Sequence, residues 1–375
     1  MKRIMIIVMV AALMLGLCAC IGAQPTTSSD TKPADTTAAP VETDAAATAG
    51  TTAETAAATQ SAETAGNSET QAPTESASTD APVLRIYSLK GPTSMGLATL
   101  LQANEAGQTQ LRYDSTICTA ADEVTAALVN GSADIALLPA NAAATLFNKA
   151  GGFSVVAINT LGVLYVVENG ESVQSVKDLA GKTICLTGKG TTPEYALRYL
   201  LAANGIEDQV TLEFKSEAQE VVTAMSEDLA MIGLLPQPFV TAAMMQNENL
   251  RIALDLNSEW NSVSTDSAMV TGVTVVRNEI LEQYPEQIQT FLAEAAEGVD
   301  QVNDDPEAAA ELIVNMEIVA KAPIAAKAIP YCNLVCITGE GMKSMLSGYL
   351  QTLYEQNPKA VGESMPSDDF YYTGE

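Results

Sequence analysis

ADIALLPANAA, residues 133–143, returns 97 positions later as AMIGLLPQPFV, residues 230–240. At the same offset, ADEVTAALVNGSADIALLP (121–139) aligns without a gap on AQEVVTAMSEDLAMIGLLP (218–236). Each copy has the pattern of an amphipathic helix, a short turn and an apolar strand that ends at proline. The repeated offset indicates an internal duplication.

The similarity continues upstream of these segments. LRIYSLKGPTSMGLATLLQAN (84–104) parallels KTICLTGKGTTPEYALRYLLAAN (182–204), and both read as a strand, a Lys-Gly loop with threonine, and a helix. Strands that alternate with helices form parallel sheets, and strands as apolar as IALLP are buried on both faces. The sequence therefore predicts an α/β protein with two doubly wound lobes and a cleft between them. A single repetitive α/β domain without such a cleft is the alternative.

This layout resembles the solute-binding proteins of ABC importers, within them the nitrate, sulfonate, taurine and thiamine-precursor group. The segments that carry the resemblance are GPTSMGLATLL (91–101), ADIALLPANAA (133–143), VLYVVENGESVQSVKDLAGKTI (163–184), TGKGTTPEYALRYLL (187–201) and LLPQPFV (234–240). The resemblance implies a periplasmic-binding-protein-like fold of type II, with a hinge that the chain crosses twice. It implies a first lobe from residues 82–164 and 269–375, a second lobe from 165–268, and crossings near 164–167 and 265–271.

The N-terminus has the pattern of an export signal. Lys2 and Arg3 precede an apolar run, residues 4–17, that is too short to span a bilayer. The run leads into Leu-Cys-Ala-Cys, which resembles the lipobox of bacterial lipoproteins. Residues 1–20 are the expected signal peptide with its lipobox, and Cys20 is expected to be lipidated and to become N-terminal after cleavage. We therefore expect a lipid-anchored protein on the extracytoplasmic face of the cell membrane. An ordinary secretory signal is the alternative.

Residues 21–81 consist almost entirely of Thr, Ala, Ser, Gly, Pro, Gln and acids. A segment of this composition cannot bury enough apolar surface to offset its ordering entropy, so we expect a disordered linker. No later apolar stretch approaches the ~20 residues of a membrane span. The lipid is therefore the only expected membrane attachment.

Composition excludes several classes of function. The chain has a net charge of −28, and residues 82–375 hold 37 Asp and Glu against 15 Lys and Arg, so nucleic acid is not an expected partner. The chain contains no histidine, which removes Ser/His/Asp and Cys/His catalysis and most transition-metal sites. We expect no metal, no cofactor and no catalytic residue. Four cysteines follow the lipobox, and a buried apolar role is expected for Cys118, Cys185, Cys332 and Cys336; PYCNLVCITG (330–339) reads as a strand.

The ligand site of an open α/β sheet lies outside the carboxyl ends of its strands, where loops lead into helix N-termini. Four such places are expected, at residues 88–94, 140–141, 187–192 and 237–238. Two of them are rich in Gly, Ser and Thr, whose backbone N–H groups and hydroxyls suit an anion at a helix N-terminus. The candidate ligand-binding residues are Ser88, Gly91, Thr93, Ser94, Asn141, Tyr165, Thr187, Thr191, Thr192, Tyr195 and Gln237.

Each candidate has an alternative role. Ser and Thr can cap the helices, Lys90 and Lys189 can be solvated surface residues, and the tyrosines can pack in the core or stack on a planar ligand. The sequence offers no arginine fork for an anion. A cationic solute would need an aromatic cage and cleft carboxylates, of which Glu194 is the one acid in a cleft loop.

Neither glycine-rich loop has the spacing of a Walker or dinucleotide motif. The expected function is capture of a small anion or heterocycle by hinge closure, and the resemblance implies delivery to an ABC permease and its ATPase by a monomeric protein. The alternatives are an enzyme of the menaquinone-pathway type on the same fold and a sensory surface lipoprotein.

Overall fold

The protein is described here from a computed structural model, in which residues 82–265 and 267–374 are described. Contacts divide the chain into Met1–Thr70 and Gln71–Glu375, and every described element belongs to the second unit. The expected signal peptide, the lipidated Cys20 and the linker 21–81 lie outside the described residues. Within them, no helix combines the length and apolarity needed to cross a membrane.

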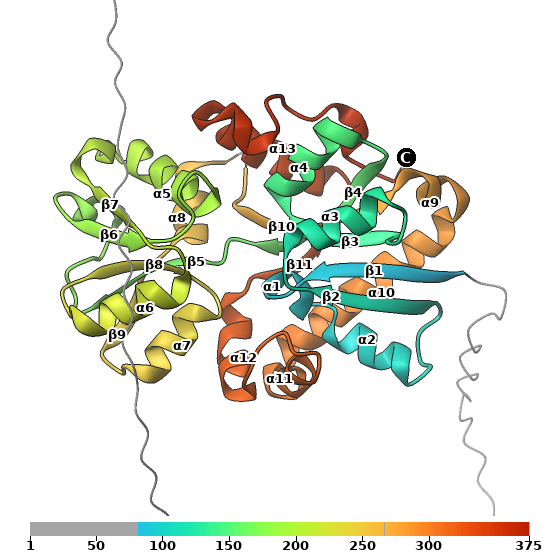
Figure 1. Cartoon of the computed structure of the whole chain (residues 1–375), viewed down its shortest axis with the longest axis horizontal. Helices are drawn as coiled ribbons and strands as arrows, with labels where there is room; N and C mark the ends of the chain where they lie inside the picture. The colour runs from blue at the N-terminus through green and yellow to red at the C-terminus, as the bar shows by residue number, and fades with distance from the viewer. Residues whose placement is uncertain (1–81, 266, 375) are drawn as a thin grey trace, which may run out of the picture. The chain divides into compact units, whose positions relative to one another are not determined.

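The first sheet has six strands in the order β11-β4-β10-β3-β1-β2 (Figure 1). They are β1 (Val83–Leu89), β2 (Arg112–Cys118), β3 (Ile135–Pro139), β4 (Phe153–Leu161), β10 (Val270–Arg277) and β11 (Leu334–Ile337). Strand β1 pairs in parallel with β2 and β3, whereas β10 lies antiparallel between β3 and β4. The first lobe is the set of elements built around this sheet.

The second sheet has five strands in the order β7-β6-β8-β5-β9. They are β5 (Leu164–Asn169), β6 (Thr183–Leu186), β7 (Thr211–Phe214), β8 (Ile232–Pro236) and β9 (Leu250–Asp255). Strand β6 pairs in parallel with β7 and β8, and β5 lies antiparallel between β8 and β9. The second lobe is the set of elements built around this sheet.

Helices cover both faces of each sheet (Figure 1), so the mixed α/β, doubly wound fold is confirmed. Around the first sheet they are α1 (Pro92–Met95), α2 (Ala98–Glu105), α3 (Ala121–Val129), α4 (Ala140–Ala150), α9 (Asn278–Gln283), α10 (Pro285–Asp304), α11 (Pro306–Asn315), α12 (Ala322–Ala328) and α13 (Gly339–Gln356). Around the second they are α5 (Thr192–Ala203), α6 (Ala218–Glu227), α7 (Phe239–Gln246) and α8 (Leu256–Val263). Single 3₁₀ turns lie at Val176–Leu179, Glu207–Gln209, Ile329–Tyr331, Pro358–Val361 and Asp368–Phe370.

The duplication is visible in the element order. Strand, helix, strand, helix, strand runs from β1 to β3 and again from β6 to β8, and β3 and β8 each have four buried residues before an end at proline. The strands of each copy are parallel, as predicted. The sequence did not indicate that a strand from outside each copy, β10 in one sheet and β5 in the other, would run antiparallel at the same position in both.

One apolar cluster runs through both lobes. It contains Leu164 and Val166 of β5, Trp260 of α8 and Tyr349 of α13, all of them buried. Trp260 lies between the rings of Tyr199 and Tyr349, at centroid distances of 4.2 and 5.6 Å. On the side of α5, α8 and α13 the two lobes therefore share a core.

Candidate functional site

The loop between β1 and α1 is held together by its own hydroxyl groups. Thr93 Oγ1 donates to the carbonyl of Leu89 at 2.8 Å, and Ser94 Oγ lies 2.6 Å from the same carbonyl and 2.8 Å from Ser88 Oγ. All three hydroxyl side chains are buried, whereas Gly91 is half-buried. Gly91 has φ 127° and ψ −158°, a conformation that needs glycine. The side chains thus shape this loop, and its partly exposed backbone is what can reach a ligand.

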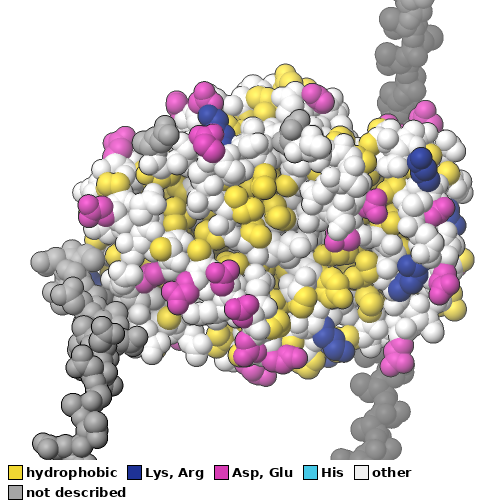
Figure 2. Space-filling model, turned by 180° about the vertical axis from the view of Figure 1, so that it is seen from behind, with side chains coloured by type: hydrophobic (Ala, Val, Ile, Leu, Met, Phe, Trp, Pro, Cys, Tyr) yellow, Lys and Arg dark blue, Asp and Glu magenta, His cyan; other side chains and the backbone are white. Residues whose placement is uncertain are grey.

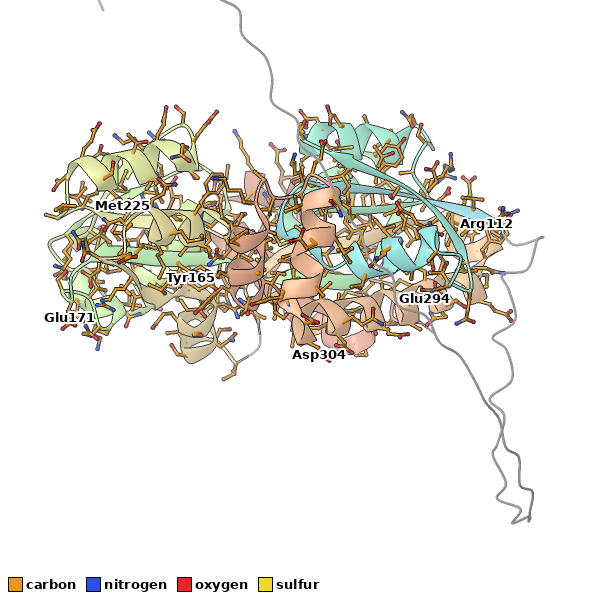
Figure 3. All side chains as sticks on the ribbon, turned by 90° about the horizontal axis from the view of Figure 1, so that it is seen from below. Arg112, Tyr165, Glu171, Met225, Glu294 and Asp304 are labelled. Carbon is orange, nitrogen blue, oxygen red and sulfur yellow. The ribbon has the colours of Figure 1, made fainter. Side chains whose placement is uncertain are left out.

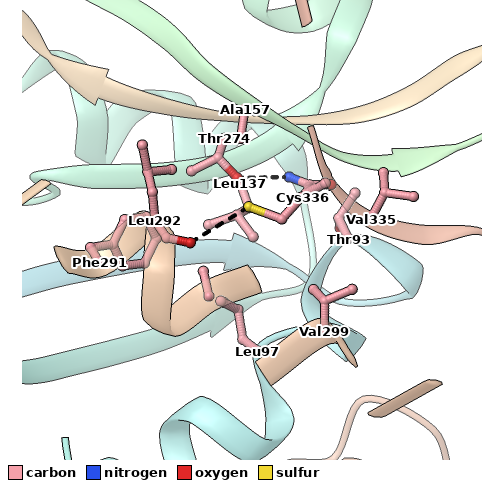
Figure 4. A pocket seen from close by; sticks show the side chains of 13 residues that line it. Thr93, Leu97, Leu137, Ala157, Thr274, Phe291, Leu292, Val299, Val335 and Cys336 are labelled. Atoms are coloured by element: carbon pink, nitrogen blue, oxygen red, sulfur yellow. Dashed lines mark hydrogen bonds between the residues drawn. The ribbon is translucent and has the colours of Figure 1, made fainter. Parts of the chain in front are cut away.

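Thr93 also borders a small internal cavity of the first lobe (Figure 4). The cavity measures about 20 Å³ and is lined mainly by apolar side chains of β3, β4, α10 and β11, with Asn159, Thr274 and Cys336 as further polar neighbours. Such a volume holds about one water molecule. This cavity is therefore too small for a solute.

The equivalent loop of the second lobe, between β6 and α5, is closed by a carboxylate. Glu194 Oε2 accepts the Gly190 N–H at 2.7 Å, and Glu194 Oε1 accepts from Arg198 Nε at 2.8 Å. Burial alone would raise the pKa of Glu194, but the Gly190 N–H and the Arg198 guanidinium together lower it. The start of α5 thus already carries a negative charge of its own.

Threonines complete this second loop. Thr191 Oγ1 donates to the carbonyl of Gly188 at 2.7 Å, and the Thr191 N–H donates to the same carbonyl at 2.9 Å. Thr191 is exposed, while Thr187 and Thr192 are half-buried. The three threonines predicted here therefore remain accessible, unlike the hydroxyl residues of the first loop.

The two tyrosines predicted for the site are packed between other groups. Tyr195 is 7% exposed, and its hydroxyl donates to Gly190 O at 2.8 Å and accepts from Asn357 Nδ2 at 2.6 Å. Tyr165 lies in the second lobe on the side toward the first (Figure 3), with its hydroxyl 2.7 Å from Tyr331 O and its ring edge-on to that of Tyr331 at 6.1 Å. Both tyrosines thus contact residues of the first lobe from the second.

Gln237 and Asn141 follow the two duplicated strands. Gln237 is 2% exposed, its Oε1 accepts from Thr241 Oγ1 at 2.8 Å, and its backbone N–H donates to Val163 O at 3.0 Å. Its Nε2 has no partner among the described residues. A buried amide donor without a partner is unfavourable, so this group is suited to a ligand acceptor. Asn141 is half-buried in the first turn of α4.

A larger pocket lies between the lobes, where a cleft was predicted, but none of its lining residues was among the candidates. This interlobe pocket measures about 410 Å³, within the range of small-molecule sites. Its lining residues are Thr241, Met244, Met245, Glu248 and Ile252 of the second lobe and Lys327 and Tyr331 of the first. Thr241 joins the pocket wall to Gln237 through the hydrogen bond given above. Sequence reasoning missed these lining residues because they lie along the flank of α7, away from the strand ends. The only local sign of them in the sequence was the pair of adjacent methionines in α7.

The arginines near the two sheets are bound to acids of the chain. Arg85 contacts both carboxylate oxygens of Asp134, at 2.9 and 2.5 Å, and Arg277 lies 3.7 Å from the same group. Arg251 contacts Glu168 at 2.5 Å. Each of these guanidinium groups is therefore engaged by an acid of the chain, although Nε of Arg277 has no partner among the described residues. Acidic side chains are spread over the face shown in Figure 2, with few basic ones among them.

The described cysteines are free thiols, and Cys118, Cys185 and Cys332 are buried as expected. Cys336 is half-buried. The expectation of a strand through Cys332 was wrong: β11 begins at Leu334, because Asn333 has φ 47° and breaks the extended backbone. Among the described residues no group of three or more His, Cys, Asp or Glu is arranged to hold a metal ion.

Similarity to solved structures is extensive in fold and low in sequence. An ABC transporter protein of Parabacteroides distasonis is 22% identical with a TM-score of 0.66, and covers 77% of this chain and 98% of its own. The periplasmic aliphatic sulphonate binding protein SsuA of Escherichia coli is 19% identical with a TM-score of 0.60, covering 76% and 92%. The alkanesulfonate-binding protein SsuA of Xanthomonas axonopodis pv. citri, bound to MOPS, is 13% identical with a TM-score of 0.56, covering 78% and 99%. Comparison with curated protein sequences gives no match.

Residues 104–320 match the sequence model of a family described as ABC transporter, phosphonate, periplasmic substrate-binding protein. The match includes β3, the second sheet and the second-lobe residues of the interlobe pocket, and it ends before Lys327 and Tyr331. It covers more than half of the chain, and the fold agrees with it. The protein therefore belongs to the phosphonate family of periplasmic substrate-binding proteins of ABC transporters.

Proposed function

We propose that this protein captures a small organic anion of the sulfonate or phosphonate type between its lobes and presents it to an ABC permease. Two observations carry the proposal: the interlobe pocket, and the unpartnered Nε2 donor of Gln237, a residue whose Oε1 accepts from Thr241 in the pocket wall. The pocket offers apolar walls from Met244, Met245 and Ile252 for an organic substituent and the Lys327 ammonium for a negative charge. A nitrate-type ion, which has no apolar surface to place against these walls, or a small heterocycle is the second candidate.

The proposed ligand contacts extend from this pocket to the loops at the strand ends. Backbone N–H groups near Gly91 and the accessible Thr187, Thr191 and Thr192 supply further donors at the starts of helices. The buried candidates Ser88, Thr93, Ser94 and Tyr195 hold these loops by hydrogen bonds. Tyr165 instead contacts Tyr331 of the interlobe pocket. Asn141 and Gln237 complete the set.

We further propose that residues 82–164 and 269–375 form one domain and residues 165–268 the other. The chain passes from the first sheet to the second after β4 and returns before β10, which supports these boundaries. Solute contacts made from both domains would favour a closed arrangement of the monomer, which the permease then recognises. Lipidation of Cys20 and cleavage before it belong to the same proposal, and they rest on the sequence alone.

Titration calorimetry with methanesulfonate, MOPS, methylphosphonate and nitrate tests the function directly. These probes follow from the family and from the sulfonates named for the two SsuA structures. At least one sulfonate or phosphonate should bind and should raise the unfolding temperature, because a ligand of the folded state stabilises it. The absence of binding by all four would contradict the proposal. Cleavage of a probe during the titration would instead support the enzyme alternative.

A further inference from the structure

The C-terminal end of α13 reaches across to the start of α5 in the other lobe. Gln356, the last residue of α13, donates from Nε2 to the backbone carbonyl of Tyr195 at 3.1 Å. The next residue, Asn357, donates from Nδ2 to the Tyr195 hydroxyl at 2.6 Å. That hydroxyl donates in turn to Gly190 O at 2.8 Å. A continuous run of hydrogen bonds thus leads from the first lobe into the loop between β6 and α5.

The loop between β6 and α5 needs contacts from residues outside it to be held in one conformation. Gly188 and Gly190 have φ values of 78° and 72°, and glycine leaves many other conformations open to the unfolded loop. The Gly190 N–H donates to Glu194 of α5. The Gly190 carbonyl accepts from the hydroxyl of Tyr195, which in turn accepts from Asn357. The peptide groups that follow Gly190 are those of Thr191 and Thr192. The Gly190 carbonyl shares its peptide group with the Thr191 N–H, which donates to Gly188 O at 2.9 Å. The place where this carbonyl is held therefore affects that bond and the direction of the next N–H, that of Thr192.

We propose that Asn357 is a positioning residue for solute binding: through the Tyr195 hydroxyl it sets the carbonyl of Gly190 and thereby the donors at the start of α5. This inference rests on the proposed function in that the loop 187–192 contacts the solute. In this inference Tyr195 supports the loop and does not stack on a ligand.

The packing of α13 on the second lobe has a source other than the hydrogen bond from Asn357 to Tyr195. Trp260 is fully buried, with Tyr199 of its own lobe on one side and Tyr349 of α13 on the other. The packing of these three rings keeps α13 against the second lobe. Loss of one hydrogen bond from Asn357 is therefore expected to act on the loop and to leave the lobes packed.

Asn357→Asp is the variant that tests the hydrogen bond to Tyr195 most specifically. Asn357 Oδ1 accepts the Lys359 N–H at 3.1 Å and caps the 3₁₀ turn at Pro358–Val361, which also identifies the amide atom facing Tyr195 as nitrogen. Aspartate keeps the size and this cap but presents an acceptor to Tyr195. The tyrosine hydroxyl is then drawn to the new carboxylate and releases the Gly190 carbonyl. Asn204→Asp is the matched control, because Asn204 lies at the other end of α5 and its Nδ2 bonds Leu200 O.

The experiment combines amide hydrogen exchange of the solute-free protein with titration of the probe that binds best, MOPS or methylphosphonate. Asn357→Asp should speed exchange of the amides at 190–192 and weaken binding about five- to tenfold, the effect of one hydrogen bond. Trp260 fluorescence should stay at the wild-type value, and Asn204→Asp should change neither exchange in the loop nor affinity. In a Tyr195→Phe background, Asn357→Asp should have no further effect.

Each other outcome is decisive. Wild-type exchange at 190–192 in Asn357→Asp would overturn the positioning role, whether or not a probe binds. Faster exchange with unchanged affinity would overturn its connection to the solute. Failure of the wild-type protein to bind any probe contradicts the proposed function, while exchange in the loop still decides the role of Asn357.

Discussion

At the scale of single residues, small hydroxyl side chains of the loops stabilise the loop backbone, and the local sequence does not reveal this role. Ser88, Thr93 and Ser94 were predicted to face a ligand, and their hydroxyls are buried against the Leu89 carbonyl and one another. The loop pattern of Gly, Ser and Thr fits capping and ligand binding equally, because both need hydroxyls at a helix start. Burial separates the two roles, and Thr93 is surrounded in part by residues of β10 and α10, which lie more than 170 positions away in the chain.

Gly188 should be the residue of the second loop that tolerates a side chain least. A Cβ there would lie 2.5 Å from Thr191 Oγ1 and 3.0 Å from the ring of Pro193, in addition to the strain of φ 78°. We expect Gly188→Ala to cost about 2–4 kcal/mol of unfolding free energy. Gly181→Ala is the control, because Gly181 has φ 77° and no atom within 4 Å of its Cβ. Urea unfolding should show a loss of about 1 kcal/mol of unfolding free energy for the control. Equal losses of unfolding free energy in both variants would refute the close approach of the new Cβ to Thr191 and Pro193.

Gln237 supplies the direct test of the unused donor. Gln237→Glu keeps an oxygen for Thr241 and replaces Nε2 by a second oxygen, which repels an anionic solute. Affinity for the best sulfonate or phosphonate should fall at least tenfold by calorimetry. Gln246→Glu makes the same charge change at the exposed far end of α7 and should leave affinity within about twofold. A similar loss in both variants would indicate a general charge effect and remove Gln237 from the site.

At the scale of elements, the duplicated units could be predicted and their long-range partners could not. Helix α3 with β3 and helix α6 with β8 follow from local periodicity at a fixed offset. The antiparallel insertion of β5 and β10 depends on pairing between distant segments, as do the contacts of α13 with α5. The interlobe pocket along α7 was missed for the same reason, since two of its seven lining residues, Lys327 and Tyr331, come from α12 and the turn after it.

The turn after β5 is an element whose stability should depend on pH. Burial alone would raise the pKa of Glu168, but hydrogen bonds from Ser172 and Val173 and the charge of Arg251 lower it below the ordinary value of 4.5. A lowered folded-state pKa means that this contribution is complete above about pH 4.5 and is lost as the pH falls toward the folded-state pKa.

Glu168→Gln should therefore reduce the unfolding free energy by about 1–3 kcal/mol at pH 7 and make its decline below pH 4.5 shallower. Glu171→Gln, at an exposed neighbour, is the control and should change neither quantity measurably. Chemical unfolding between pH 3 and 8 measures both. An acid decline as steep in Glu168→Gln as in the wild type would show that other carboxylates cause it.

At the scale of the whole molecule, the two sides of the lobe junction differ. On the side of α5, α8 and α13 the core is continuous through Trp260 and Tyr349. On the side of α7 and α12 the lobes enclose the interlobe pocket, and Phe239, Met245 and Tyr331 remain partly exposed. This asymmetry predicts that the lobes pivot about the first side and open at the second. Sequence alone could propose a hinge from the family resemblance, but it could not say which helices would stay packed.

Opposite charges face the same pocket at the side that we expect to open, Glu248 from the second lobe and Lys327 from the first. If solute binding draws α7 and α12 together, the two charges approach, and an exposed pair of this kind contributes about 0.2–1 kcal/mol. Glu248→Lys and Lys327→Glu should then each weaken solute binding severalfold, and the double reversal should restore it in low salt and less so in 1 M salt. If Lys327 instead contacts the anion, Lys327→Glu should cause the larger loss and Glu248→Lys should not repair it. Calorimetry of the four proteins at two salt concentrations therefore separates closure by paired charges from direct recognition of the solute, and equal affinities throughout would contradict both.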